Sequence, residues 1–495
     1  MGGWLLALRS WLLALGYWLL ATGCWLLGTG YWLVEIGIRP IRRIGPIGLM
    51  LLLLAATSAF AEERFPPPDF TESGYQMPEI LDDIQRTPER RADYMPWVDL
   101  AMLAWTMILA AFFSLKLRSR PALFTLAIIC LIYFGFYRCG CICSIGAIQN
   151  VSLAAFTPEV YALPLAVAGF FLLPLLFALF FGRVFCSAVC PLGAIQDLIV
   201  VRPIDLPAAL RGALGLIPYV YLALAVLVAA LGAGFLICEY DPFVAIFRMD
   251  GSYNMLLFGG SLLVIGLFIG RPYCRFLCPY GVLLSWLAPF AKWKVKIHPE
   301  NCTQCRLCEE SCPFQAINTP TPETEPARRL EGKRGLALSL ALIPAGLLLG
   351  AALGYLGGPV LAGLHHKVAL AEQVRAYELE QEGYAERLTK VTGSMEPPPA
   401  PLPVDEVDAF QKHDGDAKEL YAEAMAIRAR FGNGGALAGA FMGLVIALKL
   451  MRLYIRRKRT GYEADAGACV SCARCYMTCP GEHARLGLVG EEQTK

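Results

Sequence analysis

Apolar runs of membrane-spanning length dominate the sequence and predict a mainly helical membrane protein. Seven such windows follow a polar, proline-containing segment: 98–115, 121–137, 161–182, 213–236, 254–270, 335–358 and 434–450. A helix needs about 20 predominantly apolar residues to cross the hydrocarbon core, and each window is near that length. We therefore predict a mainly α fold, a polytopic helical bundle in membrane lipid with about seven spans in the mature chain.

The N-terminus carries a seven-residue repeat followed by a secretory signal. The repeat places Trp4, Trp11, Trp18, Trp25 and Trp32 in equivalent positions. It is either one face of a helix or upstream sequence translated from a misplaced start. Basic residues, an apolar stretch and Ala59-Phe60-Ala61 then have the order of a cleavable signal peptide. We expect residues 1–61 to be removed, leaving 62–97 as an extracytoplasmic segment; an uncleaved anchor would leave the same side outside.

Basic residues in the short loops indicate the orientation of the spans. Lysine and arginine follow the first, third, fifth and seventh windows, whereas the loop 139–161 has none and the loop 238–253 has only Arg248. Cytoplasmic loops are the ones enriched in these residues. The pattern predicts a multi-pass protein of the bacterial cytoplasmic (inner) membrane whose mature chain starts outside.

The predicted spans divide the mature chain into alternating units. A five-span membrane domain covers 98–290, and cytoplasmic segments cover 291–333 and 452–495. Between these segments lie a sixth span at 334–358, an extracytoplasmic region at 359–432 and a seventh span at 433–451. Two polar halves of helical composition, 368–388 and 404–431, flank the proline-rich stretch 397–403. We expect an external helical hairpin, either a solvated cap or a docking surface.

Composition narrows the class of protein further. With 56% hydrophobic and 17% charged residues, the chain is not an ordinary soluble enzyme. A net charge of +2 offers no argument for nucleic-acid binding. Eighteen cysteines against five histidines indicate metal or redox chemistry. No histidine lies in a predicted span and no C-x-x-C-H occurs, so we expect no haem.

Two four-cysteine runs are the strongest chemical signal. Cys302, Cys305, Cys308 and Cys312 precede Pro313, and Cys469, Cys472, Cys475 and Cys479 precede Pro480. This spacing is that of bacterial ferredoxins with two clusters, in which the fourth cysteine ligates the other cluster. We therefore predict one [4Fe-4S] cluster on Cys302, Cys305, Cys308 and Cys479, and a second on Cys469, Cys472, Cys475 and Cys312. Zinc is the less fitting alternative, because its sites usually use paired C-x-x-C knuckles.

The two runs lie far apart in the sequence. A single ferredoxin domain needs both on one side of the membrane, and the two intervening spans allow this. We therefore predict a split bacterial-type 2[4Fe-4S] ferredoxin domain on the cytoplasmic side.

A repeated C-x-x-x-C pattern at the ends of predicted spans supplies two further candidate sites. Phe134 to Gln149 matches Phe181 to Gln196, and Gly270 to Gly281 is a looser copy. The predicted topology puts Cys186, Cys190, Cys274 and Cys278 at the cytoplasmic boundary, and Cys139, Cys141, Cys143 and Cys238 at the outer one. Each set suggests a further Fe-S or metal centre. The alternatives are structural thiols inside and disulfides outside.

These cysteine motifs resemble those of membrane polyferredoxins of the NapH/NosR type and, more distantly, of the CcoG family. The resemblance rests on FGRVFCSAVCPLGAIQD, GRPYCRFLCPYG and CTQCRLCEESCPF. It implies an electron conduit between a cytoplasmic or quinol donor and an extracytoplasmic redox partner. About 36 residues precede the first span, which are too few for the flavin domain of NosR. We therefore expect no covalent flavin in this chain, and we expect a separate flavoprotein partner.

Three functions follow from these features. The leading prediction is an integral-membrane iron–sulfur electron-transfer protein, an electron-transfer subunit more than a stand-alone enzyme. One rival is a metal-ion (copper) or disulfide reductase, as the CcoG resemblance implies. The other is a scaffold subunit of a respiratory complex, in which the clusters mainly stabilise the cytoplasmic domain.

Overall fold

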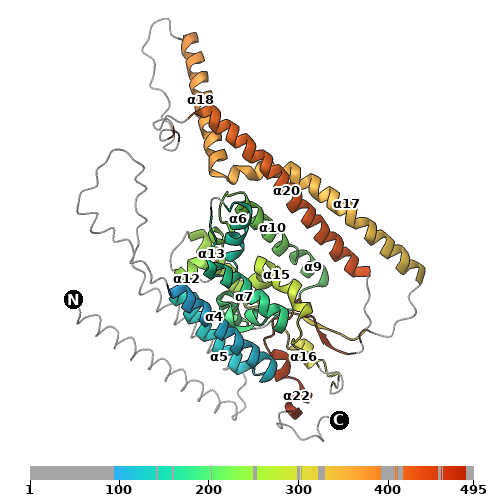
Figure 1. Ribbon diagram of the computed structural model, residues 1–495. Helices are drawn as coiled ribbons and strands as arrows, with labels where there is room; N and C mark the ends of the chain where they lie inside the picture. The colour runs from blue at the N-terminus through green and yellow to red at the C-terminus, as the bar shows by residue number, and fades with distance from the viewer. Residues whose placement is uncertain are drawn as a thin grey trace, which may run out of the picture.

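The computed structural model describes residues 94–485 apart from 141–142, 159–160, 202, 249–252, 298–301, 303, 322–328, 392–406, 408–409, 411–415, 455–458 and 460. The tryptophan repeat, the predicted signal peptide and nearly all of the segment 62–97 lie outside the described residues. The described part is mainly helical, as the apolar windows predicted (Figure 1).

Among the described residues, five helices are long and apolar enough to cross a membrane: Met95–Lys116, Arg120–Tyr137, Ala208–Ala230, Leu340–Leu364 and Ala417–Arg452. The first two combine α4 (Met95–Ala111) with η2 (Phe112–Lys116), and α5 (Arg120–Cys130) with η3 (Leu131–Tyr137). The third combines α9 (Ala208–Leu214) with α10 (Ile217–Ala230). The chain is thus a multi-pass membrane protein.

The predicted count of seven spans is less firmly supported than the helical bundle itself. The windows 161–182 and 254–270 correspond to α7 (Leu165–Phe181) and α13 (Tyr253–Gly266), which have 17 and 14 residues. At 1.5 Å per residue these helices reach roughly 25 and 21 Å, short of a hydrocarbon core about 30 Å thick. Seven spans therefore remain a prediction.

Short helices pack the cysteine motifs into the bundle. They are α6 (Ala147–Phe156), η4 (Phe185–Val189), α8 (Pro191–Ile199), α11 (Leu236–Glu239), α12 (Val244–Arg248), α14 (Pro272–Phe276), α15 (Pro279–Leu287) and η5 (Ala288–Phe290). Cys190 and Cys278 are the N-cap residues of α8 and α15, and the proline after each is the first helical residue. Proline suits this position because its φ is already helical and its missing N–H would have no partner there. The Cys-Pro pairs therefore fix where these helices begin.

A glycine-lined helical hairpin runs along one flank of the bundle. It consists of α17 (Arg329–Leu361) and α20 (Ala417–Tyr454), which lie side by side in Figure 1. A Cβ on Gly354 would lie 1.9 Å from the carbonyl oxygen of Gly435, and one on Gly350 would lie 2.2 Å from that of Gly439. Small residues four apart thus let the two backbones touch, as in other membrane helix pairs.

The polar hairpin predicted at 359–432 is present with different bounds. Its first helix is α18 (His366–Val391), preceded by η7 (Ala362–Leu364), while its second is the N-terminal part of α20. α20 begins at Ala417 and continues without a break into the predicted seventh span, and α17 begins inside the predicted ferredoxin segment. Val368, Val374 and Phe431 belong to a small separate core between α18 and α20. The side of the membrane on which this hairpin lies stays a prediction.

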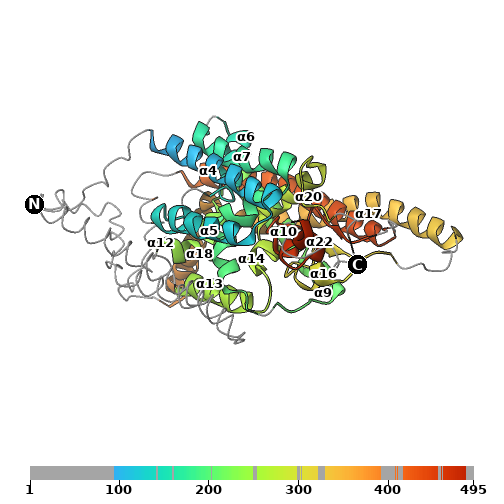
Figure 2. The same ribbon diagram turned by 90° about the horizontal axis from the view of Figure 1, so that it is seen from below.

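Both cysteine runs fold into one small domain. α16 (Leu307–Glu310) and β1 (Ile317–Asn318) come from the first run, and β2 (Glu463–Ala464), α21 (Arg474–Met477) and α22 (Pro480–Arg485) come from the second. β1 and β2 pair antiparallel, with Ile317 opposite Ala464. α16 and α22 lie at the end of the bundle opposite α6 and α13 in Figure 1, and Figure 2 shows the two grouped together.

Candidate metal centres

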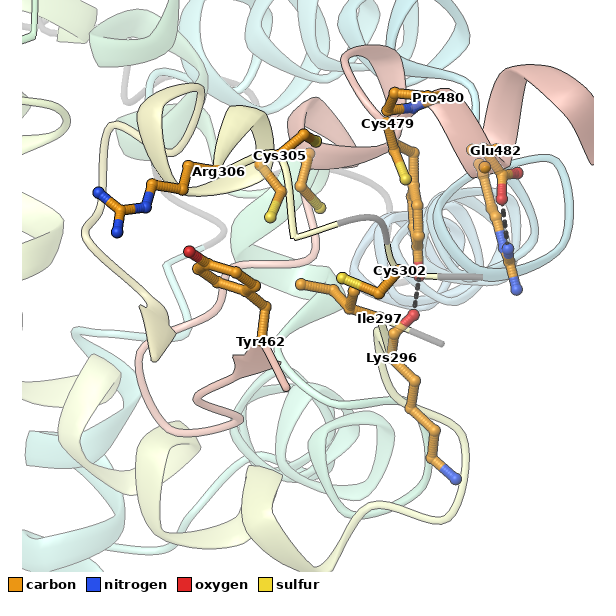
Figure 3. A pocket seen from close by; sticks show the side chains of 14 residues that line it. Lys296, Ile297, Cys302, Cys305, Arg306, Tyr462, Cys479, Pro480 and Glu482 are labelled. Carbon is orange, nitrogen blue, oxygen red and sulfur yellow. Dashed lines mark hydrogen bonds and ion pairs between the residues drawn. The ribbon is translucent and has the colours of Figure 1, made fainter. Parts of the chain in front are cut away.

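The first cavity of this domain gathers one complete predicted ligand set. It measures about 70 Å³, and Cys302, Cys305, Cys308 and Cys479 line it together with Cys475. Figure 3 shows Cys302, Cys305 and Cys479 facing a common space although they come from two separate cysteine runs. Tyr462 closes one side of this space. The structure therefore places the fourth cysteine of the second run beside the first three of the first run.

A second cavity of about 20 Å³ gathers the other set: Cys312, Cys469, Cys472 and Cys475. The crossed placement of the fourth cysteine thus occurs in both directions. Because Cys475 lines both cavities, the two sets are direct neighbours. The first set is closer to the surface, since Cys305 is exposed, whereas Cys472 is buried.

The backbone around both sets has the same unusual conformation. Gln304 and Arg306 flank Cys305 with φ of 53° and 63°, and Ser471 and Ala473 flank Cys472 with φ of 53° and 59°. Non-glycine residues rarely adopt positive φ, and the strain is tolerated mainly where function requires it. Successive N–H groups in such alternating conformations form concave anion sites, which iron–sulfur clusters commonly use. The loops therefore fit an anionic group held by the thiols.

The buried thiols would need a metal to lose their protons. Burial raises the pKa of Cys308 to about 11 and that of Cys469 to about 12. At neutral pH these groups would stay protonated without iron, and iron binding would release the protons.

Among the described residues no three His, Cys, Asp or Glu side chains converge tightly enough to hold a single metal ion. A [4Fe-4S] cluster needs four separate thiolates.

The structure also brings together the predicted inner set of Cys186, Cys190, Cys274 and Cys278. The thiols of Cys274, Cys186 and Cys278 are close enough to raise the pKa of Cys190 further beyond the effect of burial. Gln196 Nε2 donates to the Cys274 sulfur at 3.5 Å, and the Gly281 N–H donates to the Cys278 sulfur at 3.3 Å. Four buried or half-buried thiols therefore share one site, as the topology predicted.

Two buried arginines give this inner site a positive surround. Arg183 Nη2 lies 3.8 Å from the Cys186 sulfur, and Arg271 donates to the Cys186 carbonyl oxygen. The Nε groups of both arginines are buried and have no hydrogen-bond partner among the residues that the structure describes. Buried guanidinium donors that lack an acceptor beside four thiols fit an anionic iron–sulfur group, because an unsatisfied buried donor is otherwise costly. The inner set therefore fits a cluster better than a group of structural thiols.

Asp197 is a residue that sequence reasoning missed. Its carboxylate pairs with Arg120, with Arg271 at 3.3 Å and with Arg474 at 2.9 Å. Burial alone would raise the pKa of Asp197, but the three arginines together hold it well below its usual range. The signal available in the sequence was the single difference between the repeated copies G-A-I-Q-N and G-A-I-Q-D, which places Asn150 and Asp197 in equivalent positions.

The outer set is only partly described. Cys141 lies outside the described residues, and Cys139, Cys143 and Cys238 lie within them. Cys143 and Cys238 both lie against Gly146: the Gly146 N–H donates to the Cys143 sulfur at 3.3 Å, and a Cβ on Gly146 would be 3.2 Å from the Cys238 sulfur. The structure thus brings two of the predicted outer residues together.

Comparison with protein families places iron–sulfur chemistry at the same segments. Residues 163–207 and 252–298, which contain the inner cysteines, match one model described as a 4Fe-4S binding domain. Residues 295–318, which contain the first ferredoxin run, match a second model with the same description.

Several curated proteins are similar over parts of the chain. NirI of Paracoccus denitrificans is 34% identical over 24% of this chain and 18% of its own length. YccM of Escherichia coli, whose name describes electron transport, is 29% identical over 23% of this chain and 33% of its own. NosR of Pseudomonas aeruginosa, a regulatory protein by name, is 33% identical over 16% of this chain and 12% of its own.

The chain therefore spans a third or less of these three relatives. No solved structure matches it. Over its cysteine-bearing segments, the chain is similar to membrane-bound iron–sulfur electron-transport proteins of the NapH/NosR type.

Proposed function

We propose that this chain is an integral-membrane iron–sulfur electron carrier of the bacterial inner membrane, with its ferredoxin domain in the cytoplasm. The two ferredoxin sets and the inner set would each hold a [4Fe-4S] cluster, and each cluster supplies one-electron redox chemistry when bound. An extracytoplasmic redox partner, such as a flavoprotein, exchanges electrons with the carrier on the opposite side of the membrane. The contacts described below support this assignment.

The observation that carries the proposal is the position of Arg183. Its Nη1 donates to the Gly467 carbonyl oxygen at 2.8 Å, two residues before Cys469, while its Nη2 lies 3.8 Å from the Cys186 sulfur. One guanidinium therefore joins the second ferredoxin set to the inner set. Arg271 repeats the arrangement, because it contacts the Cys186 carbonyl oxygen and lies over the ring of Phe314, two residues after Cys312.

These contacts arrange the three sets in a sequence. The Cys302 set is at the surface of the ferredoxin domain, the Cys469 set shares Cys475 with it, and the inner set follows across Arg183. Electrons from a soluble cytoplasmic donor would enter at the exposed Cys305.

A membrane quinol is the other donor class, and a cavity beside the inner set supports it. The cavity measures about 670 Å³ and includes Cys274 and Cys278 in its lining. Tyr219, Trp286 and Phe441 line another part of it, between α10, α15 and α20. Charged side chains such as Arg275 and Lys449 complete the lining, and apolar walls with convergent polar groups are the usual form of small-molecule sites.

The test is a spectroscopic redox titration of the purified full-length chain, with iron analysis. Three centres and about twelve irons per chain are expected, since each [4Fe-4S] cluster contributes four. Replacing Cys186 with serine should remove one centre and leave two. Two centres and about eight irons in the wild-type chain would refute the inner cluster.

A further inference from the structure

The outer cysteines occupy a structural copy of the inner site. Gln196 Oε1 accepts a hydrogen bond at 3.0 Å from the N–H of Tyr273, the residue before Cys274. At the outer site Gln149 Oε1 accepts one at 3.0 Å from the N–H of Ile237, the residue before Cys238. Cys143 therefore corresponds to Cys190 and Cys238 to Cys274, each held by the same glutamine contact.

The copy lacks the features that fit the inner site to an anionic cluster. Phe136 stands in place of Arg183, and Phe235 stands in place of Arg271, three residues before the cysteine. Pro242 stands where the inner site has Cys278. The neighbouring Arg138 pairs with the buried carboxylate of Asp99. Burying a polyanionic cluster among phenylalanines would leave its charge uncompensated, so this site favours thiol chemistry.

The thiols of Cys143 and Cys238 differ in solvent exposure, as thiol–disulfide exchange requires of an attacking and a resolving cysteine. Cys238 is exposed, whereas Cys143 is half-buried behind it, and both lie against Gly146. Thiol–disulfide exchange needs one accessible sulfur to attack and a second to resolve the mixed disulfide.

A short aromatic contact connects the outer and inner sites. The rings of Phe243 and Tyr273 meet edge to face at 5.4 Å, and both side chains are buried. Tyr273 precedes Cys274 of the inner set, and Phe243 accompanies Asp241 in the loop that follows Cys238. This contact links the loop after Cys238 to the segment that carries Cys274.

We propose that Cys143 and Cys238 form a redox-active dithiol that reduces a disulfide on the side of the membrane opposite the ferredoxin domain. This inference rests on the proposed function, because the electrons that regenerate the dithiol come from the inner site. It names the class of the extracytoplasmic partner, a protein or small molecule that carries a disulfide.

The dithiol reduces a partner disulfide in two successive exchange steps. The Cys238 thiolate attacks one sulfur of the partner disulfide, the partner S–S bond breaks, and the released thiolate takes a proton. Cys143 then attacks Cys238, which forms the internal disulfide and releases the second partner thiol. Two electrons from the inner site and two protons restore both thiols. Asp241, which is buried three residues after Cys238, is placed to exchange one of these protons.

The test uses the full-length chain in detergent and oxidised glutathione as the disulfide probe. Chain reduced with a chemical thiol, which leaves the clusters oxidised, and then desalted should consume about one glutathione disulfide per chain and yield a linked Cys143–Cys238 peptide in mass spectrometry. Cys143→Ser should instead trap glutathione on Cys238, and Cys238→Ser should show neither product. Cys130→Ser, which removes a buried thiol of α5, should behave like the wild type.

Iron content distinguishes this proposal from an outer metal site. Cys143→Ser and Cys238→Ser should retain the wild-type iron content, and a loss of iron in either would overturn the proposal. Absence of the linked peptide in the wild type would also overturn it. A Cys186→Ser chain tests the proposed function separately, because viologen should no longer reduce its outer disulfide, although a chemical thiol should still do so.

Discussion

Asp197 Oδ1 accepts a hydrogen bond from Arg474 Nη2 at 2.9 Å, between residues 277 positions apart. Arg474 directly precedes Cys475, the cysteine that lines both ferredoxin cavities, and Asp197 lies on α8 of the membrane domain. The same carboxylate pairs with Arg120 at the start of α5 and with Arg271 before α14. One buried carboxylate therefore fastens the ferredoxin domain to two elements of the membrane domain.

Replacing Asp197 with asparagine should destabilise the whole chain. The substitution leaves three arginines without their carboxylate, and breaking a buried ion pair typically costs about 3–5 kcal/mol. We expect a lower melting temperature in detergent together with earlier release of iron. The matched control is Glu463→Gln, which removes a half-exposed partner of Arg459 at 3.7 Å in the same domain. An exposed pair is worth about 1 kcal/mol or less, so equal losses in the two variants would contradict the assignment.

Acid should weaken the same contact in a defined direction. The three arginines outweigh burial and hold the pKa of Asp197 below its usual value, so its contribution to stability is present above the unfolded pKa of about 3.9. That contribution is lost as the pH falls below about 4 towards the folded pKa. The melting temperatures of the wild type and Asp197→Asn should therefore converge on acidification. If the difference in melting temperature between the two proteins stayed constant from pH 7 to pH 3, ionisation of Asp197 would not be the source of the lost stability.

The crossed placement of the fourth cysteines predicts which centre each variant damages. Cys479 lines the cavity of Cys302, so Cys479→Ser should alter the same spectroscopic signal as Cys302→Ser. Cys312→Ser should alter the signal that Cys469→Ser alters. Electron paramagnetic resonance of the partially reduced variants measures this directly. Pairing of Cys479→Ser with Cys469→Ser would mean that each run holds its own cluster.

Arg183 should influence the reduction potentials of the second ferredoxin centre and the inner centre, but not that of the Cys302 centre. Its guanidinium contacts the Gly467 carbonyl oxygen and the Cys186 sulfur, and positive charge there favours the more negative, reduced form of a neighbouring centre. Arg183→Gln should lower the reduction potentials of those two centres and leave the Cys302 centre unchanged. Arg183→Lys keeps the charge and should produce a smaller shift. A uniform shift of all centres would indicate a general structural effect instead.

Local signals in the sequence predicted which cysteines the fold brings together. The ferredoxin runs predicted which of their cysteines share a cavity, because the spacing and the Cys-Pro turn determine the loop that holds them. Cys186 and Cys274, in the C-x-x-x-C copies, were placed on one side by counting apolar windows, which depends only on composition. These features are encoded within stretches of a few residues.

Long-range partnerships could not be predicted in the same way. Nothing near Asp197 in the sequence specifies that it meets Arg474, and nothing near Arg183 specifies the carbonyl oxygen of Gly467. The apolar windows also extend beyond α7 and α13, because apolar residues such as Tyr161 and Phe268 lie outside the helices, in the segments that flank them. Such contacts depend on the whole fold, whereas the cysteine spacing depends on one loop.

The glycine-lined contact between α17 and α20 offers a test of the hairpin that joins the two halves of the ferredoxin domain. A Cβ on Gly354 would lie 1.9 Å from the Gly435 carbonyl oxygen, whereas one on Gly357 of the same helix would meet nothing within 4 Å. Gly354→Ala must push the backbones apart, at a cost of about 1–3 kcal/mol or more. Gly357→Ala should be neutral or stabilise by roughly 0.5–1 kcal/mol, since alanine is the better helix former. Thermal unfolding in detergent, followed by tryptophan fluorescence, separates the two; equal melting temperatures would mean that the helices do not touch through this face.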